Sequence, residues 1–192
     1  MKVKTLFLIC FLSITCLLNA ADKPVIQIHT DNSSLIFRIA DNGRLYQSYL
    51  GKKLSHETDI SHLPHGTEAY ITHGMEDYFE PAIHILHNDG NPSLLLKYVS
   101  HETKAVSQGV NETIITLGDD KYPVTVKLHY VTYPAEDIIK TYTEISHKEK
   151  KPVVLHQYAS SMLHLNRAKY YLTEFAGDWA HEANISDQPL EF

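Results

Sequence analysis

Cysteine is nearly missing from the sequence. The 192-residue chain contains two, Cys10 and Cys16, and both lie within the first twenty residues. Those twenty residues have the form of a secretory signal peptide, so we expect a mature chain without any thiol. Such a chain forms no disulfide, has no cysteine nucleophile and offers no thiolate to a metal. Packing alone must therefore hold its fold together.

The signal-peptide prediction covers residues 1–20. Lys2 and Lys4 supply a positive end, residues 6–18 form an apolar stretch, and small residues follow near Ala20. The stretch is shorter than the roughly 20 apolar residues of a membrane-spanning helix, so we expect no membrane span. A lipid anchor at Cys16 is less favoured, because a Thr precedes it where lipoprotein signals usually have Gly or Ala. The sequence thus predicts a periplasmic or extracellular protein.

Positive charge is scarce as well. The chain has 17 basic and 23 acidic residues, which gives a formal net charge of -6, and neither sign forms a run. A surface that binds nucleic acid needs a basic patch or stripe. We therefore expect no nucleic-acid partner.

The sequence also lacks the helical spacing of apolar residues, and it shows instead an alternation of apolar and polar residues. No stretch of twelve or more residues after residue 20 has apolar side chains at helical spacing. In residues 124–130 the apolar side chains instead occupy every second position, which is typical of an antiparallel strand with one buried face. Seven further segments rich in β-branched and aromatic residues predict strands, namely 25–28, 35–39, 94–99, 113–117, 141–145, 153–158 and 168–175.

Turn-forming residues separate these segments. Asp41-Asn42-Gly43 is the strongest short hairpin signal, and residues 88–92 and 118–120 repeat its chemistry. Eight or more strands joined by short turns predict an all-β fold, an antiparallel two-sheet β-sandwich that forms one domain over residues 21–192.

Two regions do not fit the pattern. Residues 56–74 contain Pro64, Gly66 and four histidines with little alternation, which predicts a long exposed loop of the kind that often makes contacts. Residues 185–192 show no closing element. We therefore expect a domain that belongs to a longer protein.

The histidines of the irregular stretch do not predict a metal site. His62 and His65 lie close together, with His56 and His73 nearby, but this spacing fits no standard zinc motif. We expect no metal and no cofactor.

A carboxylate cluster follows at Glu76, Asp77 and Glu80. Glycoside hydrolysis needs two carboxyl groups that flank one bond, whereas neighbouring side chains of an extended segment point to opposite faces. No nucleophile elbow and no phosphate-binding loop occurs in the sequence. We expect no catalytic residue in this chain.

Trp179 is the only tryptophan, and it follows the last predicted strand in the run Gly177-Asp178-Trp179, close to Glu182. An exposed indole ring can stack on the apolar face of a sugar while nearby acids bind the hydroxyls. The residues alone leave a second interpretation equally open, in which Trp179 closes the edge of the sandwich.

Several runs occur in a fixed order: GRLYQSYLGKKL at 43–54, GMEDYFEPAI at 74–83, a long strand at 119–130 followed by DIIK at 137–140, and GDWAHE at 177–182. In this order they resemble the N-terminal domain of bacterial α-galactosidases of glycoside hydrolase family 36. The resemblance extends over nearly all of residues 21–192. Phe79 and Lys140 stand where that family usually has Arg, so contacts made by those arginines do not carry over.

This resemblance implies a β-supersandwich of the galactose-mutarotase type, followed by a catalytic (β/α)8 barrel with two aspartates in a retaining mechanism. Neither aspartate is matched here. The resemblance further implies an α-galactoside oligosaccharide as ligand, a homo-oligomeric enzyme, and substrate-binding roles for Trp179 and Asp77 at the rim of the active site. Two alternatives are a stand-alone carbohydrate-binding sandwich without catalysis and a scaffold that only assembles subunits.

Overall fold

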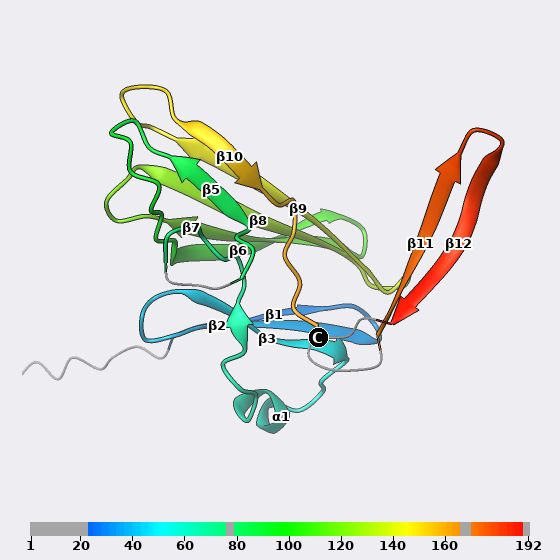
Figure 1. The fold of residues 1–192 in the computed structure, drawn as a ribbon. Coiled ribbons are helices and arrows are strands. Elements are labelled where there is room, and N and C mark those ends of the chain that lie inside the picture. Colours follow the sequence, from blue (N-terminus) through cyan, green and yellow to red (C-terminus); the bar gives the residue numbers. More distant parts are fainter. Residues whose placement is uncertain (1–22, 76–78, 166–169, 190–192) are drawn as a thin grey trace, which may run out of the picture.

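The computed structural model describes residues 23–75, 79–165 and 170–189, and nearly all of its regular structure is β-strand (Figure 1). None of the helices in these residues is long and apolar enough to cross a membrane. The elements are β1 (Val25–His29), β2 (Ser33–Ile39), β3 (Leu45–Lys52), α1 (Glu57–Ser61), β4 (Thr67–Glu68), β5 (Ile83–Leu86), β6 (Lys97–Ser107), β7 (Val110–Gly118), β8 (Val124–Tyr133), β9 (Ile138–His147), β10 (Val154–Tyr158), β11 (Tyr171–Asp178) and β12 (His181–Pro189).

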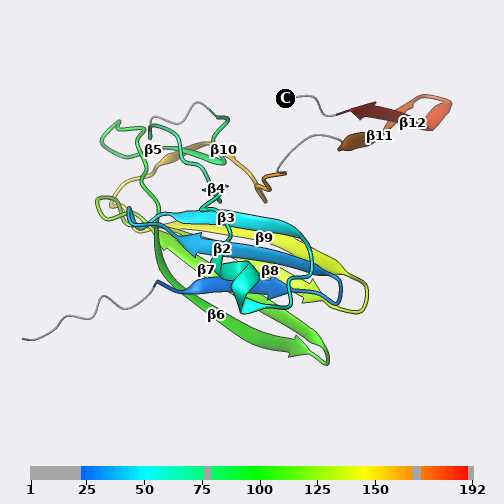
Figure 2. The same ribbon diagram turned by 90° about the horizontal axis from the view of Figure 1, so that it is seen from below.

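The first sheet contains β1, β2, β3 and β4 in that order, with every pair antiparallel. The predicted turn at residues 41–43 joins β2 to β3, and Gly43 adopts a positive φ of 80° there. The short helix α1 lies against the outer side of this sheet (Figure 2). Arg38 of β2 donates a hydrogen bond to the Ile60 carbonyl of that helix.

The second sheet is a meander of β6, β7, β8 and β9, again antiparallel throughout. The alternation seen in the sequence decides which way its side chains point. Val126 and Leu128 are buried, whereas Thr125 and Lys127 between them are partly exposed. The strand predicted at residues 124–130 is confirmed, but His129, expected to face water, is buried because the Tyr142 ring stacks on it.

The two sheets pack face to face and enclose the main core (Figure 1). Phe37 of β2 meets Tyr130 of β8 across the interface, with ring centroids 5.2 Å apart. Burying each large apolar side chain contributes roughly 1.5–3 kcal/mol relative to leaving it exposed. The predicted antiparallel two-sheet sandwich is confirmed.

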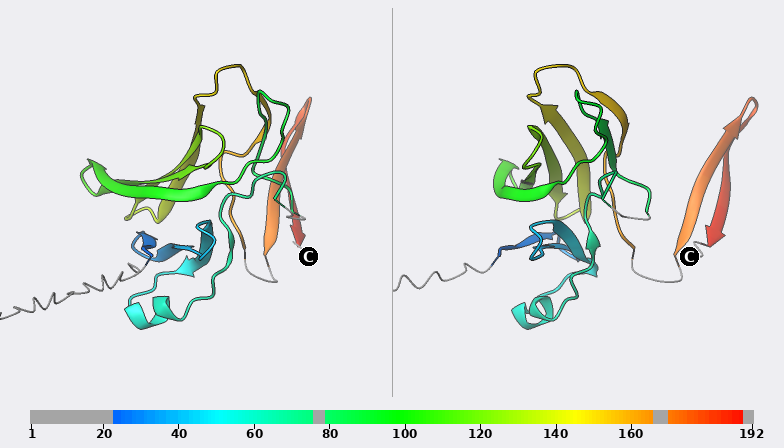
Figure 3. Two further views of the ribbon diagram at one scale, coloured as in Figure 1. Left: turned by 90° about the vertical axis from the view of Figure 1, so that its left-hand side faces the viewer. Right: turned by 60° about the vertical axis from the view of Figure 1, so that its left-hand side comes forward.

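Two smaller ladders accompany the sandwich. Strands β5 and β10 pair antiparallel, and Ile83 and Ile85 of β5 join the core. Strands β11 and β12 form a hairpin that projects away from the sandwich (Figures 1 and 3). Nearly all side chains of this hairpin are exposed.

Two sequence predictions need correction. Residues 56–74 are not simply an exposed loop, because they form α1 and β4, and residues 69–72 are buried beside β3 and β5. The C-terminal residues do include a closing element, since β12 pairs with β11. The strand predicted at 168–175 begins at Tyr171 in the described part of the chain, and residues 166–169 lie outside it.

Candidate functional site

Trp179 lies at the tip of the β11–β12 hairpin. Asp178 pairs with His181, so Trp179 and Ala180 form a two-residue turn, in which Ala180 has a positive φ of 64°. The Trp179 amide donates a hydrogen bond of 2.6 Å to the Asp178 side chain. The Trp179 side chain is 92% exposed, so the interpretation in which it closes the sandwich edge is wrong. The hairpin carries this ring away from the core and leaves it available for stacking.

The hairpin below Trp179 is apolar on one face. Tyr171, Thr173 and Phe175 occupy every second position of β11, so their side chains lie on the same side of the strand. Phe175 pairs directly with Ile185 of β12. All three apolar side chains are largely exposed. Residues 171–189 contain four acids and no Lys or Arg. The hairpin therefore presents an apolar and acidic surface.

Asp77, the second residue predicted to bind substrate, lies outside the described residues together with Glu76. The third acid of that cluster, Glu80, is described and exposed. Its carboxylate accepts a hydrogen bond of 2.9 Å from the Gln157 side chain of β10. Glu80 is thus engaged by the β5–β10 ladder.

A hollow of about 450 Å³ lies next to this acid. Phe79 is 68% exposed at its rim. The other lining residues are Thr67, Ile71, Glu80 and residues 162–165. Among the described lining residues Glu80 is the one carboxylate, so the hollow offers an apolar contact surface and no acid/base pair.

His164 fixes the segment that lines this hollow. Its backbone exchanges two hydrogen bonds with the Gln47 side chain, and its Nε2 lies 2.7 Å from the Glu68 carbonyl oxygen. Burial lowers the pKa of His164, and the hydrogen bond to Glu68 opposes that effect only in part. The ring acts as an anchor for residues 159–165.

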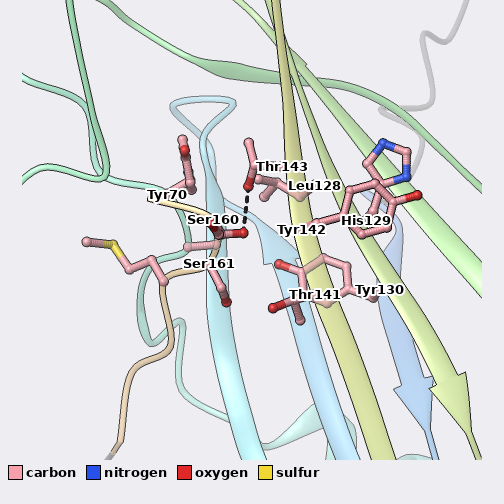
Figure 4. A pocket seen from close by; sticks show the side chains of 11 residues that line it. Tyr70, Leu128, His129, Tyr130, Thr141, Tyr142, Thr143, Ser160 and Ser161 are labelled. Atoms are coloured by element: carbon pink, nitrogen blue, oxygen red, sulfur yellow. Dashed lines mark hydrogen bonds between the residues drawn. The ribbon is translucent and has the colours of Figure 1, made fainter. Parts of the chain in front are cut away.

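A much smaller cavity, of about 10 Å³, lies between β9 and this segment (Figure 4). The Thr143 hydroxyl donates to the Ser160 carbonyl oxygen across it, and the Tyr70 hydroxyl donates to the Ala159 carbonyl oxygen nearby. Burial raises the pKa of Tyr70 above its ordinary value. A cavity of this size holds about one water molecule, so it is no sugar site.

Two polar clusters elsewhere were not predicted from the sequence. On the outer face of the second sheet, Glu112 accepts hydrogen bonds from Tyr142, Lys104 and His129. Among the loops, the ring of His87 stacks on Tyr122 and lies 2.7 Å from a Glu149 oxygen. Their members are far apart in sequence, so only the tertiary fold brings them together. Internal contacts engage most of their polar atoms, whereas Nε2 of His129 is buried without a hydrogen-bond partner among the described residues.

The four histidines of residues 56–74 are not gathered at one point. His56 and His62 flank α1, whereas His73 stacks on His84 of β5. Within the described ranges, no group of three or more histidine, cysteine or acidic side chains is placed to hold a metal ion.

The family comparison gives a match over most of the chain. The model of the glycosyl hydrolase family 36 N-terminal domain matches residues 42–192. No curated protein matches the sequence at a significant level.

Solved structures with the same fold are α-galactosidases. The α-galactosidase from Lactobacillus brevis matches with a TM-score of 0.75 and 20% identity. The galactosidase domain of an α-galactosidase-sucrose kinase matches with a TM-score of 0.77 and 20% identity. A variant of the α-galactosidase AgaA from Geobacillus stearothermophilus, in complex with raffinose, matches with a TM-score of 0.79 and 19% identity. Each match covers 88% of this chain but only 28% or 29% of the other one.

Proposed function

The chain belongs to the family of glycosyl hydrolase family 36 N-terminal domains, and from this premise we propose that it is the non-catalytic β-sandwich of an α-galactosidase. In this proposal the enzyme releases α-linked galactose from oligosaccharides by a retaining mechanism. The chain spans about 28% of the length of the enzymes that share its fold. Catalysis then belongs to a barrel domain downstream of the sandwich.

The family match is the observation that carries this proposal. The described residues are consistent with it, since among those that line the hollow beside Phe79 Glu80 is the one carboxylate and glycoside hydrolysis requires two. The apolar hollow and the apolar face of the hairpin are surfaces that a catalytic domain or a second subunit would cover. An isolated two-stranded hairpin is at best marginally stable in water, so β11 and β12 gain stability from such a partner.

Trp179 and Asp77 are the residues proposed to reach the rim of the active site. The exposed indole ring of Trp179 offers a stacking face for a galactose unit, and the Asp77 carboxylate would accept hydrogen bonds from its hydroxyls. The same hairpin would contribute to a homo-oligomer of the complete enzyme.

The first test is a hydrolysis assay. The purified chain should not cleave a chromogenic α-galactoside above the rate of buffer alone. The same assay on a longer protein that includes the downstream coding sequence should show turnover. Hydrolysis by the 192-residue chain that one substitution abolishes would contradict the non-catalytic role.

A carbohydrate-binding sandwich that works without a catalytic domain is the second candidate, and the 92% exposure of Trp179 favours it. Calorimetric titration with galactose and raffinose separates the two candidates. Binding to the isolated chain that disappears in Trp179→Ala would support the stand-alone binding module. If neither the unaltered chain nor Trp179→Ala binds sugar, the result supports the accessory role.

The location of the protein is part of the proposal. Residues 1–20 have the sequence of a signal peptide, so the domain would act in the periplasm or outside the cell. Mass spectrometry of the exported protein should give an N-terminus at Ala21 or Asp22. A mature protein that retains Met1 would contradict export by this route.

A further inference from the structure

Three histidines from distant parts of the sequence lie in a row on the β5–β10 ladder. The rings of His73 and His84 stack with centroids 3.8 Å apart, and His156 follows with its centroid 4.8 Å from that of His84. His84 belongs to β5 and His156 to β10, where a bulge separates Leu155 from Gln157. His73 sits on the neighbouring segment, and its amide donates to the Ile83 carbonyl oxygen. We call these three residues the histidine row.

The geometry of the row does not suit a metal. Zinc binds imidazole nitrogens that converge on one point at about 2.0–2.1 Å. The rings of His73 and His84 are tilted by only 22°, so their nitrogen atoms point side by side and not at a common centre. The row instead brings three imidazole rings, which become cationic in acid, into mutual contact.

We propose that the histidine row is an acid-sensitive latch, which holds β10 against β5 at neutral pH and loosens when the rings become protonated. Neutral rings stack without repulsion, whereas like charges in contact repel each other. The central ring, His84, contacts both of the others, so a proton on His84 is repelled by two neighbouring rings when these are charged. The latch operates between neutral pH and about pH 5, where histidines gain their charge.

Among the described residues, no acid is found that offsets this repulsion at His84. Burial lowers the pKa of His84, and the neighbouring His73 and His156 lower it further. Glu80, from the loop before β5, binds Gln157, the residue that pairs with His84 across the ladder. Glu80 is exposed, so water and salt screen its attraction. Two more acids of the same loop, Glu76 and Asp77, lie outside the described residues.

The sign of the pH effect follows from the direction of that shift. Because the folded-state pKa of His84 lies below its unfolded value of about 6.5, the unfolded form binds its proton first. The stability that β10 gains from the row is therefore present above pH 6.5 and is lost as the pH falls through the folded-state pKa.

Loosening of β10 would act on the segment that leads to Trp179. Directly after β10, the Ala159 amide donates to the Ala82 carbonyl oxygen, and the Ala159 carbonyl oxygen accepts from the Tyr70 hydroxyl. These contacts start the anchored stretch 159–165, which the chain follows toward the β11–β12 hairpin. Acid would thus weaken the first contacts of the stretch that precedes the hairpin.

The test compares amide hydrogen exchange in β10 and β8 at pH 7.5 and pH 5.5, with rates corrected for the intrinsic chemistry and EDTA present. A local readout is needed because His29 and His164 also have lowered pKa values and affect global stability in the same direction. In the unaltered chain, exchange in β10 should accelerate several-fold relative to β8 at the lower pH, because the unfolded form takes up the His84 proton more readily.

His84→Gln should abolish that acceleration, because it removes the ring that contacts both His73 and His156. His62→Gln, at an exposed position next to α1, is the matched control and should leave it unchanged. Equal acceleration in His84→Gln, or none in the unaltered chain, would overturn the latch. If His84→Gln does not fold, His156→Gln at the exposed end of the row serves the same purpose: by NMR titration, the pKa of His84 should then rise toward 6.5. No sugar or catalytic domain takes part, so this outcome is independent of the proposed enzyme role.

Discussion

Phe37 and Phe79 are identical side chains in opposite surroundings. Phe37 is 1% exposed between the two sheets, whereas Phe79 is 68% exposed at the rim of the hollow. Phe37→Ala removes most of a ring from a close-packed core and should cost about 3–5 kcal/mol of unfolding free energy. Phe79→Ala should change stability by less than about 0.5 kcal/mol. Urea unfolding at one pH measures both, and equal losses would show that Phe79 is part of the core.

Glu112 supports a prediction about acid stability. Hydrogen bonds from Tyr142, Lys104 and His129 lower its pKa from 4.5 to about 2. A carboxylate with a lowered folded-state pKa contributes stability above about pH 4.5, and that contribution is lost as the pH falls toward 2. Glu112→Gln should therefore cost about 2 kcal/mol at pH 7 and much less near pH 2.

Glu102 is the control for this prediction, since it is an exposed acid on the neighbouring strand β6. Unfolding free energies of Glu102→Gln should follow those of the unaltered chain between pH 7 and 2.5. A loss for Glu112→Gln that stays constant over this range would show that the charge of the carboxylate does not matter.

Residue by residue, the sequence revealed what depends on local chemistry. The sequence placed Trp179 after Gly177 and Asp178 in a polar turn, which allowed an exposed ring but did not decide between exposure and closure of the sandwich edge. The binding partners of Glu112 and the stacking of His84 on His73 were not foreseeable, because each contact joins residues that only the tertiary fold brings together. A sequence pattern indicates which face of a strand is buried, but it does not name the residues of other segments that lie opposite.

At the scale of elements, the joint between α1 and β4 depends on Gly66. This residue has a φ of +82°, and a Cβ atom built on it would lie 1.9 Å from the Gln47 carbonyl oxygen of β3. Gly90 has nearly the same φ but no atom within 4 Å of its Cβ position. Gly90→Ala should cost about 1–2 kcal/mol for backbone conformation alone.

Gly66→Ala adds an overlap with the backbone of β3, so its cost should reach roughly 3–5 kcal/mol. Thermal unfolding of the two variants side by side checks the difference. Similar melting temperatures would mean that β3 and the loop separate easily, and that the close approach at Gly66 is not needed for the fold.

The β11–β12 hairpin contains the only tryptophan of the sequence, so intrinsic tryptophan fluorescence reports on this element alone. Because the indole is already in water, the emission maximum of the folded chain should equal that of the chain in denaturant. Circular dichroism should show the unfolding transition under the same conditions. A blue-shifted emission in the folded chain would reveal a surface that covers Trp179.

The elements that the sequence predicted are those with long alternation. Strand β8 was evident from seven residues, and the turn at 41–43 from its Asn-Gly pair. Strand β5 has only four residues and was not predicted, and β12 is rich in polar residues because both of its faces are exposed. Residues 69–72 are all buried, Thr72 included, so no exposed position alternates with a buried one.

At the scale of the whole molecule, the sandwich and the hairpin differ in what they contribute to the core. None of the core residues found in the described part of the chain comes from β11 or β12, whereas β1 supplies Ile26 and Ile28. A chain that ends at residue 165 should therefore keep the unfolding free energy of the full chain within about 1 kcal/mol, since it loses little buried apolar area.

Removal of residues 23–29 deletes fewer residues, but it removes two buried side chains and the edge strand of the first sheet. That shorter deletion should abolish cooperative unfolding, as measured by far-ultraviolet circular dichroism in urea. If the chain that ends at residue 165 also lost its cooperative transition, the hairpin would be a structural part of the sandwich and its free surface would not be available to a partner.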